Sequence, residues 1–72
     1  MNYKISRYEN YGNGFTKLSD IIMDDRESKE FVSMLKENGF KRINGSGIIG
    51  LSFEGETQDK MGKVQITIER VI

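Results

Sequence analysis

The side chains that most often do chemistry in proteins are missing from this chain, because it contains neither histidine nor cysteine. Histidine is the commonest general base near neutral pH and the commonest metal ligand, and cysteine supplies thiolate nucleophiles and zinc ligands. The usual serine triad cannot be built, and a structural zinc site is disfavoured. Carboxylates, lysines, tyrosines and serines remain. We therefore expect a protein that is not an enzyme and has no cofactor.

Two groups of carboxylates could bind a hard cation through oxygen. The first group consists of Asp20, Asp24, Asp25 and Glu27, and the second of Glu54, Glu56 and Asp59. The spacing of the first group differs from that of a calcium-binding EF-hand loop, and aspartate is common at the start of a helix. We interpret the first group as a helix cap with a solvated acidic turn, and the second as the solvated end of a hairpin. No metal site is expected.

Residues 45–50, GSGIIG, match the pattern Gly-x-Gly-x-x-Gly. In dinucleotide-binding proteins these glycines open a helix whose N-terminus binds pyrophosphate. Here a strand-like apolar run follows, so the first glycines are interpreted as a hairpin turn. Gly50 is interpreted as a bulge or as a point where another backbone approaches closely.

Basic and aromatic side chains gather in two strand-like segments near residues 2–11 and 40–43. They are Lys4, Arg7, Tyr8, Tyr11, Lys41 and Arg42. If the two strands are neighbours, these side chains would form a small patch whose rings can stack on nucleic-acid bases. Ordinary solvent-facing positions and a protein interface are the competing interpretations. The zero net charge, from 11 basic and 11 acidic residues, argues against nucleic acid, because domains that bind it usually carry a basic surplus.

One segment, residues 24–39, has the pattern of an amphipathic helix. Its apolar residues fall at positions 31, 32, 34 and 35, which places their side chains on one stripe of a 3.6-residue repeat. Most helices of this length are stable only when their apolar stripe is covered. This helix must therefore lie on a sheet.

Both ends of this helix carry capping signals. Asp24 is followed three residues later by Glu27, which is the pattern of a capping box. At the other end, Gly39 tolerates the positive φ that often ends a helix. We expect Phe40 to fold back onto Leu35 and close the cap.

The remaining segments read as strands separated by turns. They are residues 2–10, 15–22, 40–43, 48–54 and 63–72. Asn13 and Gly14 are the strongest signal for a type I′ hairpin turn, in which both central residues need positive φ. Ser19 and Asp20 leave an alternative open, in which residues 15–22 begin as a helical turn.

The predicted order ββαβββ defines an α+β fold with a single antiparallel sheet of four to five strands and one helix packed on one face. Residues 1–72 should form one domain with a modest core, since a chain this short buries little of its surface. We expect a cytoplasmic protein without membrane contact. It has no cysteine, no signal-peptide core, and no apolar run near the roughly 20 residues that span a bilayer.

Residues 31–53, FVSMLKENGFKRINGSGIIGLSF, resemble the helix–strand–strand core of HicA-type mRNA-interferase toxins. The resemblance covers about a third of the chain and implies a double-stranded-RNA-binding-like fold. The family carries a catalytic histidine directly after its Gly-Ser, where this sequence has Gly47. The resemblance therefore implies at most an RNA-binding domain of HicA type that lacks nuclease activity.

The absence of histidine and cysteine, the balanced charge and the small size favour a protein–protein interaction domain. The surface expected to bind the partner is an acidic helix face, made of Asp24, Asp25, Glu27, Glu30 and Glu37. Such a face would suit the basic groove of a nucleic-acid enzyme of a host, as an anti-CRISPR-like inhibitor from a phage or mobile element does. Strand 63–72 ends the chain, and at a sheet edge it would allow a homodimer.

Overall fold

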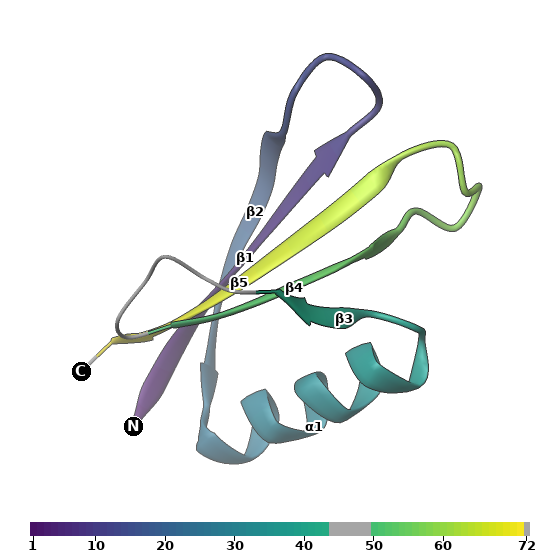
Figure 1. The fold of residues 1–72 in the computed structure, drawn as a ribbon. Coiled ribbons are helices and arrows are strands. Elements are labelled where there is room, and N and C mark those ends of the chain that lie inside the picture. Colours follow the sequence, from purple (N-terminus) through teal and green to yellow (C-terminus); the bar gives the residue numbers. More distant parts are fainter. Residues whose placement is uncertain (44–49, 72) are drawn as a thin grey trace.

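The computed structural model describes residues 1–43 and 50–71, and its elements follow the predicted ββαβββ order. The strands are β1 (Asn2–Asn10), β2 (Thr16–Asp24), β3 (Lys41–Ile43), β4 (Gly50–Glu56) and β5 (Lys63–Val71), and the helix is α1 (Asp25–Glu37). All neighbouring strands are antiparallel, in the order β2-β1-β5-β4-β3, and α1 lies on one face (Figure 1). The predicted α+β fold is confirmed.

The central strand of the sheet is β5, so the condition for a homodimer through this strand, that it lies at a sheet edge, is not met. β5 pairs with β1 on one side and with β4 on the other, which uses its backbone groups in both directions. Its inward side chains Val64, Ile66 and Ile68 are at most 5% exposed. Alternate residues can be buried this deeply only where a strand has neighbours on both sides. The edges of the sheet are β2 and β3.

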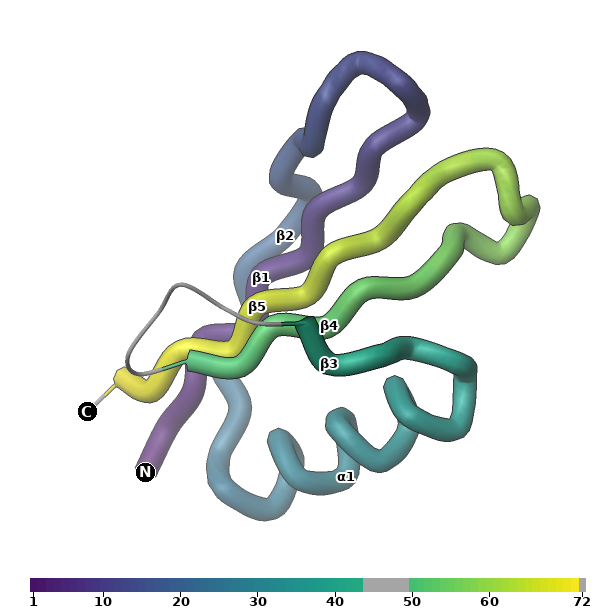
Figure 2. The backbone as a smooth tube through the Cα atoms, in the orientation of Figure 1, coloured from purple at the N-terminus to yellow at the C-terminus, as the bar shows by residue number. Residues whose placement is uncertain are grey.

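Helix α1 connects these two edge strands, so it must cross one face of the sheet (Figures 1 and 2). The core between the helix and the sheet is built from Leu35 of α1, Ile5 of β1, Phe53 of β4 and the three buried residues of β5. Phe31 and Val32 pack against it from the helix, as their spacing predicts. The turn ends of the β1–β2 and β4–β5 hairpins extend beyond the helix in Figure 1.

The predicted helix caps are both present. The Asp24 carboxylate accepts a hydrogen bond from the Glu27 N–H at 2.8 Å, and the Glu27 carboxylate accepts one from the Asp24 N–H at 3.2 Å. At the C-terminal end, the Phe40 N–H donates to the Leu35 carbonyl at 2.9 Å, while Gly39 has a φ of 83°. These contacts form a capping box and a Schellman motif, which end the helix at defined residues.

The turn between β1 and β2 differs from the predicted two-residue Asn-Gly turn. It spans residues 11–15, and Gly12 and Gly14 take positive φ while Asn13 does not. The carboxamide oxygen of Asn10 accepts hydrogen bonds from the N–H groups of Gly12 at 2.7 Å and Gly14 at 3.2 Å. This side chain organises the turn instead. The strand predicted after this turn is confirmed as β2. The alternative, in which residues 15–22 begin as a helical turn, is wrong.

Two glycines of β4 lie against other parts of the chain. A Cβ at Gly50 would lie 2.8 Å from the Ile68 carbonyl oxygen, which confirms the predicted close backbone approach. A Cβ at Gly55 would lie 2.8 Å from three atoms of the Phe40 ring, so this ring covers the glycine directly. The predicted turn at residues 44–47 and positions 45–49 of the glycine pattern lie outside the described residues.

The contact between Phe40 and Gly55 predicts that Gly55→Ala destabilises the protein by about 1–3 kcal/mol, because the new methyl overlaps the ring. Urea denaturation measures this change. In a Phe40→Ala background the same substitution should cost less, since the ring is gone. Equal costs in the two backgrounds would show that the ring does not rest on Gly55.

The capping box predicts that Asp24→Ala lowers the free energy of unfolding by about 0.5–2 kcal/mol, because the Glu27 N–H loses its acceptor. Thermal unfolding followed by circular dichroism measures this loss. Asp24→Asn is the matched control, since its carboxamide oxygen can still accept the bond, and it should stay close to the wild type. A variant Asp24→Ala as stable as the wild type would contradict the assignment.

Candidate functional site

An open groove of about 940 Å³ lies beside the C-terminal half of α1. The far end of β1 and the β4–β5 loop form its other walls. Phe31 and Met34 from the helix, Phe40 from the cap and Tyr11 from the first turn supply apolar surface. Met34 is 46% exposed, although it belongs to the apolar stripe of the helix. The groove exists because the hairpins extend past the helix, which leaves this part of the sheet face uncovered.

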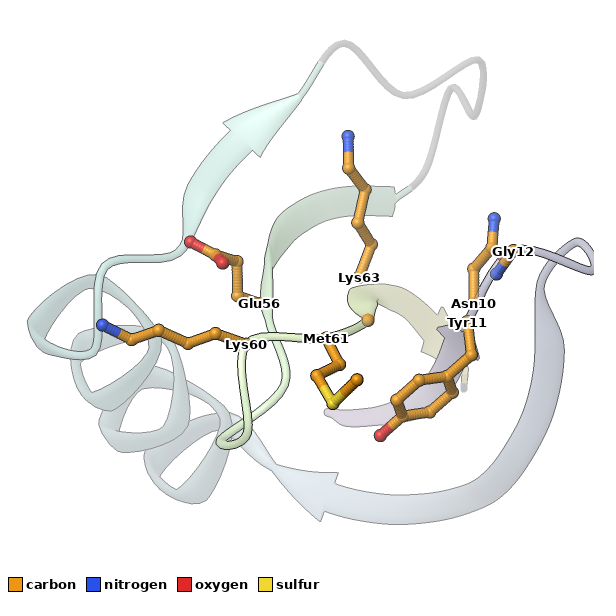
Figure 3. A pocket seen from close by; sticks show the side chains of 8 residues that line it. Asn10, Tyr11, Gly12, Glu56, Lys60, Met61 and Lys63 are labelled. Atoms are coloured by element: carbon orange, nitrogen blue, oxygen red, sulfur yellow. The ribbon is translucent and has the colours of Figure 1, made fainter.

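A second hollow of about 410 Å³ lies between the ends of the two hairpins (Figure 3). Tyr11 and Met61 reach it from different hairpins, and a Cβ at Gly62 would lie 2.8 Å from the Tyr11 ring. Tyr11 is 56% exposed and Met61 78% exposed. The two hollows share Tyr11, Glu56 and Lys60, so they form one continuous surface.

The charged side chains that line the groove are mostly acidic. Glu9, Glu56 and Asp59 face only two basic groups, Arg7 and Lys60. The Arg7 guanidinium donates from Nε at 3.0 Å and from Nη2 at 2.9 Å to Glu9 Oε2. Arg7 is therefore paired within the groove, and its charge is matched by a carboxylate. The other charged residues of the lining, Glu56, Asp59 and Lys60, carry a net charge of −1, which favours a ligand with positive charge.

Three of the five predicted acidic residues lie on the side of α1 that also carries Met34, a residue of the groove lining. Glu27, Glu30 and Glu37 follow one another at helical spacings of three and seven residues, on the side where Met34 also lies. We call these three residues the acidic stripe. The Glu30 carboxylate contacts Arg26 Nε at 3.3 Å, but both side chains are largely exposed, so the pair contributes little stability. The stripe thus places carboxylates next to an apolar wall.

The other two predicted acidic residues have different roles. Asp24 is the N-cap of the helix. Asp25 lies on another side of α1, 3.5 Å from the N-terminal ammonium group, and a hydrogen bond from Tyr3 lowers the pKa of its carboxyl. The five residues therefore do not form a single acidic face. Glu27 belongs to the capping box at the N-terminal end of α1, whereas Glu30 and Glu37 lie one helical turn on either side of Met34, which lines the groove.

The structure separates the residues of the predicted nucleic-acid patch, because β5 and β4 lie between β1 and β3. The assumption that these two strands are neighbours is wrong. Lys4 and Tyr8 lie on the face opposite the helix, since they alternate with Ile5 of the core. Arg7 lies in the groove on the helix face. Tyr11 is in the first turn, and Lys41 and Arg42 are exposed on the far edge strand.

A hydrogen-bonded chain of polar side chains occupies the open face of the sheet. Ser6 Oγ donates to Asp20 Oδ1 at 2.5 Å, and Lys17 Nζ lies 2.8 Å from Asp20 Oδ2. The bonds from Lys17 and Ser6 lower the pKa of the Asp20 carboxyl. A carboxylate stabilised in this way is a weaker base than a free aspartate. The Ser6–Asp20 hydrogen bond joins β1 to β2.

Across residues 1–43 and 50–71, no three acidic side chains lie close enough together to hold a metal ion. In the same ranges, no helix is long and apolar enough to cross a membrane. Comparison with protein-family models, curated proteins and solved structures finds no match. The resemblance of residues 31–53 to HicA-type toxins therefore stays a prediction.

Sequence reasoning missed both the groove and the exposed apolar residues of β2. The groove depends on how far the hairpins extend beyond the helix, and no local pattern encodes that distance. The signal for β2 was present, because Ile21 and Ile22 are adjacent and cannot both point into the core from a strand.

The Asp20 contacts predict how stability depends on pH. A carboxyl whose pKa is lowered by folding stabilises the protein above its ordinary pKa, and this contribution is lost as the pH falls through the lower folded-state value. We expect unfolding in urea to show stability falling below about pH 4. The variant Asp20→Asn should be less stable near neutral pH and should show a shallower fall. A fall as steep as that of the wild type would contradict this role.

Proposed function

We propose that this chain is a small protein-binding domain without enzymatic activity, which docks on its partner with the groove and the acidic stripe. The observation that carries the proposal is the position of Met34. It is half exposed at the groove, and Glu30 and Glu37 lie one helical turn away on either side. An apolar anchor next to charged groups is the arrangement found at many protein interfaces.

The chemistry of the partner follows from the lining of this surface. Carboxylates outnumber basic side chains in the groove, and Glu30 and Glu37 of the acidic stripe add more on either side of Met34. The partner should therefore present lysines or arginines around an apolar side chain that enters the groove. Electrostatic complementarity of this kind speeds association and orients the two proteins.

A basic surface with apolar elements is typical of enzymes that hold nucleic acid. The proposal therefore extends to an inhibitor that covers such a surface on a host enzyme, as anti-CRISPR proteins of phages and mobile elements do. The net charge of zero supports docking on a protein rather than on a phosphate backbone. Occupying the nucleic-acid channel requires no catalytic group on the inhibitor.

Reversing charge on the acidic stripe tests this proposal. The double variant Glu30→Lys and Glu37→Lys should bind a partner purified from the native host at least about tenfold more weakly, which is about 1.4 kcal/mol. The matched control is Glu54→Lys with Glu69→Lys, which changes the net charge equally but lies on the opposite face of the sheet. Calorimetric titration at two salt concentrations measures both, and the control should bind as the wild type does.

Met34→Ala provides a second test of the docking surface, because it removes the apolar anchor without changing the charge. It should weaken binding at both salt concentrations by a similar factor, whereas the stripe variant should show a smaller salt dependence than the wild type. Equal losses in the stripe and control variants would rule out this surface. So would a gel shift with RNA or DNA that Lys4→Ala abolishes and the stripe variant leaves intact.

A further inference from the structure

The two edges of the sheet are built differently. β3 has only three residues, two of which are Lys41 and Arg42. Natural sheets protect their edges from other strands in this way, with short strands and charged side chains. β2 has nine residues, and its apolar side chains Leu18, Ile21 and Ile22 are 54%, 51% and 56% exposed. β2 has an irregularity at Leu18, where its register with β1 shifts, but Ser19 to Asp24 pair regularly with β1. This regular stretch is the longer of the two edges, and it carries Ile21 and Ile22.

A row of apolar side chains crosses the helix face of the sheet and stops at this edge. The strand register places Leu51 opposite Ile68, Ile68 opposite Ile5, and Ile5 opposite Ile21. Ile68 and Ile5 in the middle of the row are buried, whereas Ile21 at its end is half exposed. Another strand beside β2 would continue the row and cover Ile21.

The charges of β2 identify which strand fits. Lys17 lies near its beginning, where its Nζ is 2.8 Å from Asp20 Oδ2 of the same strand, and Asp24 and Asp25 lie at and just after its end. Two copies of β2 that run antiparallel place the basic end of each beside the acidic end of the other. The net charge of zero means that no overall repulsion opposes the approach of two copies.

We propose that β2 pairs antiparallel with β2 of a second copy of this chain, with Ile21 of one copy opposite Ile21 of the other. A two-fold axis perpendicular to the sheet relates the copies and keeps both helices on the same face. This register places Asp20 opposite Ile22 and Ser19 opposite Met23, and it brings the irregularity at Leu18 near Asp24 of the other copy. The two apolar rows join into one, and the two sheets become a single continuous sheet.

This pairing is independent of the proposed docking surface. Among the described residues that line the groove, none belongs to β2. Each dimer would therefore present two open grooves. The dimer test and the partner test can fail separately, because the substitutions lie on different elements.

Light scattering after size-exclusion chromatography tests the dimer. The wild type should have twice the 8.3 kDa mass of one chain at high protein concentration. Ile21→Lys places two like charges together on the axis, and it should give the mass of a single folded chain, with circular dichroism as the check on folding. Leu18→Lys is the matched control, because Leu18 lies at the irregularity of β2, away from the axis and near Asp24 of the other copy. This variant should stay dimeric.

Disulfide cross-linking tests the register, because the natural chain has no cysteine. Ile21→Cys should form a covalent dimer rapidly under mild oxidation, since opposite residues of an antiparallel pair have close Cβ atoms. In Leu18→Cys the two sulfurs are offset by about six residues, or roughly 20 Å, and should cross-link only slowly. A wild type that stays monomeric, or a Leu18→Cys variant that cross-links as fast as Ile21→Cys, would overturn the proposal.

Discussion

The fold depends on covering one central strand. Val64, Ile66 and Ile68 of β5 are almost completely buried, and this requires β1 and β4 on its two sides and α1 across one face. In a chain of 72 residues these contacts form most of the hydrophobic core. The helix in turn needs the sheet, because a single apolar stripe has no other surface to cover it.

A single helix cannot cover five strands, and the exposed surfaces follow from this limit. α1 runs between the two edge strands and turns at the Schellman motif, where Phe40 closes over Gly55. Beyond that point the hairpins continue, and the groove lined by Met34 and Tyr11 opens. On the other side, β2 keeps Ile21 half exposed at the free edge. Both proposed interaction surfaces thus lie where the helix stops covering the sheet.

The polar groups that could have served catalysis serve structure. Asp24 caps the helix, Asp20 joins β1 to β2 through Ser6, and Asp59 accepts hydrogen bonds within the β4–β5 loop. The hydrogen bonds that these carboxylates accept favour their ionised form, which makes Asp20 and Asp59 poorer proton acceptors. We therefore propose that the protein acts by docking, through the shape and charge of its surface.

The sequence by itself determined the type and order of the elements and the two ends of the helix. The helix at residues 24–39, its two caps, the strand at residues 63–72 and the α+β class all follow from local spacing, because capping and side-chain periodicity involve residues a few positions apart. The order of the strands was decided by the tertiary structure. β5 lies between β1 and β4, because in this position both of its sides are paired and its apolar residues are covered. That choice made β2 an edge, separated the basic residues of β1 from those of β3, and opened the groove beside the helix. These outcomes depend on contacts between distant segments, which no local pattern records.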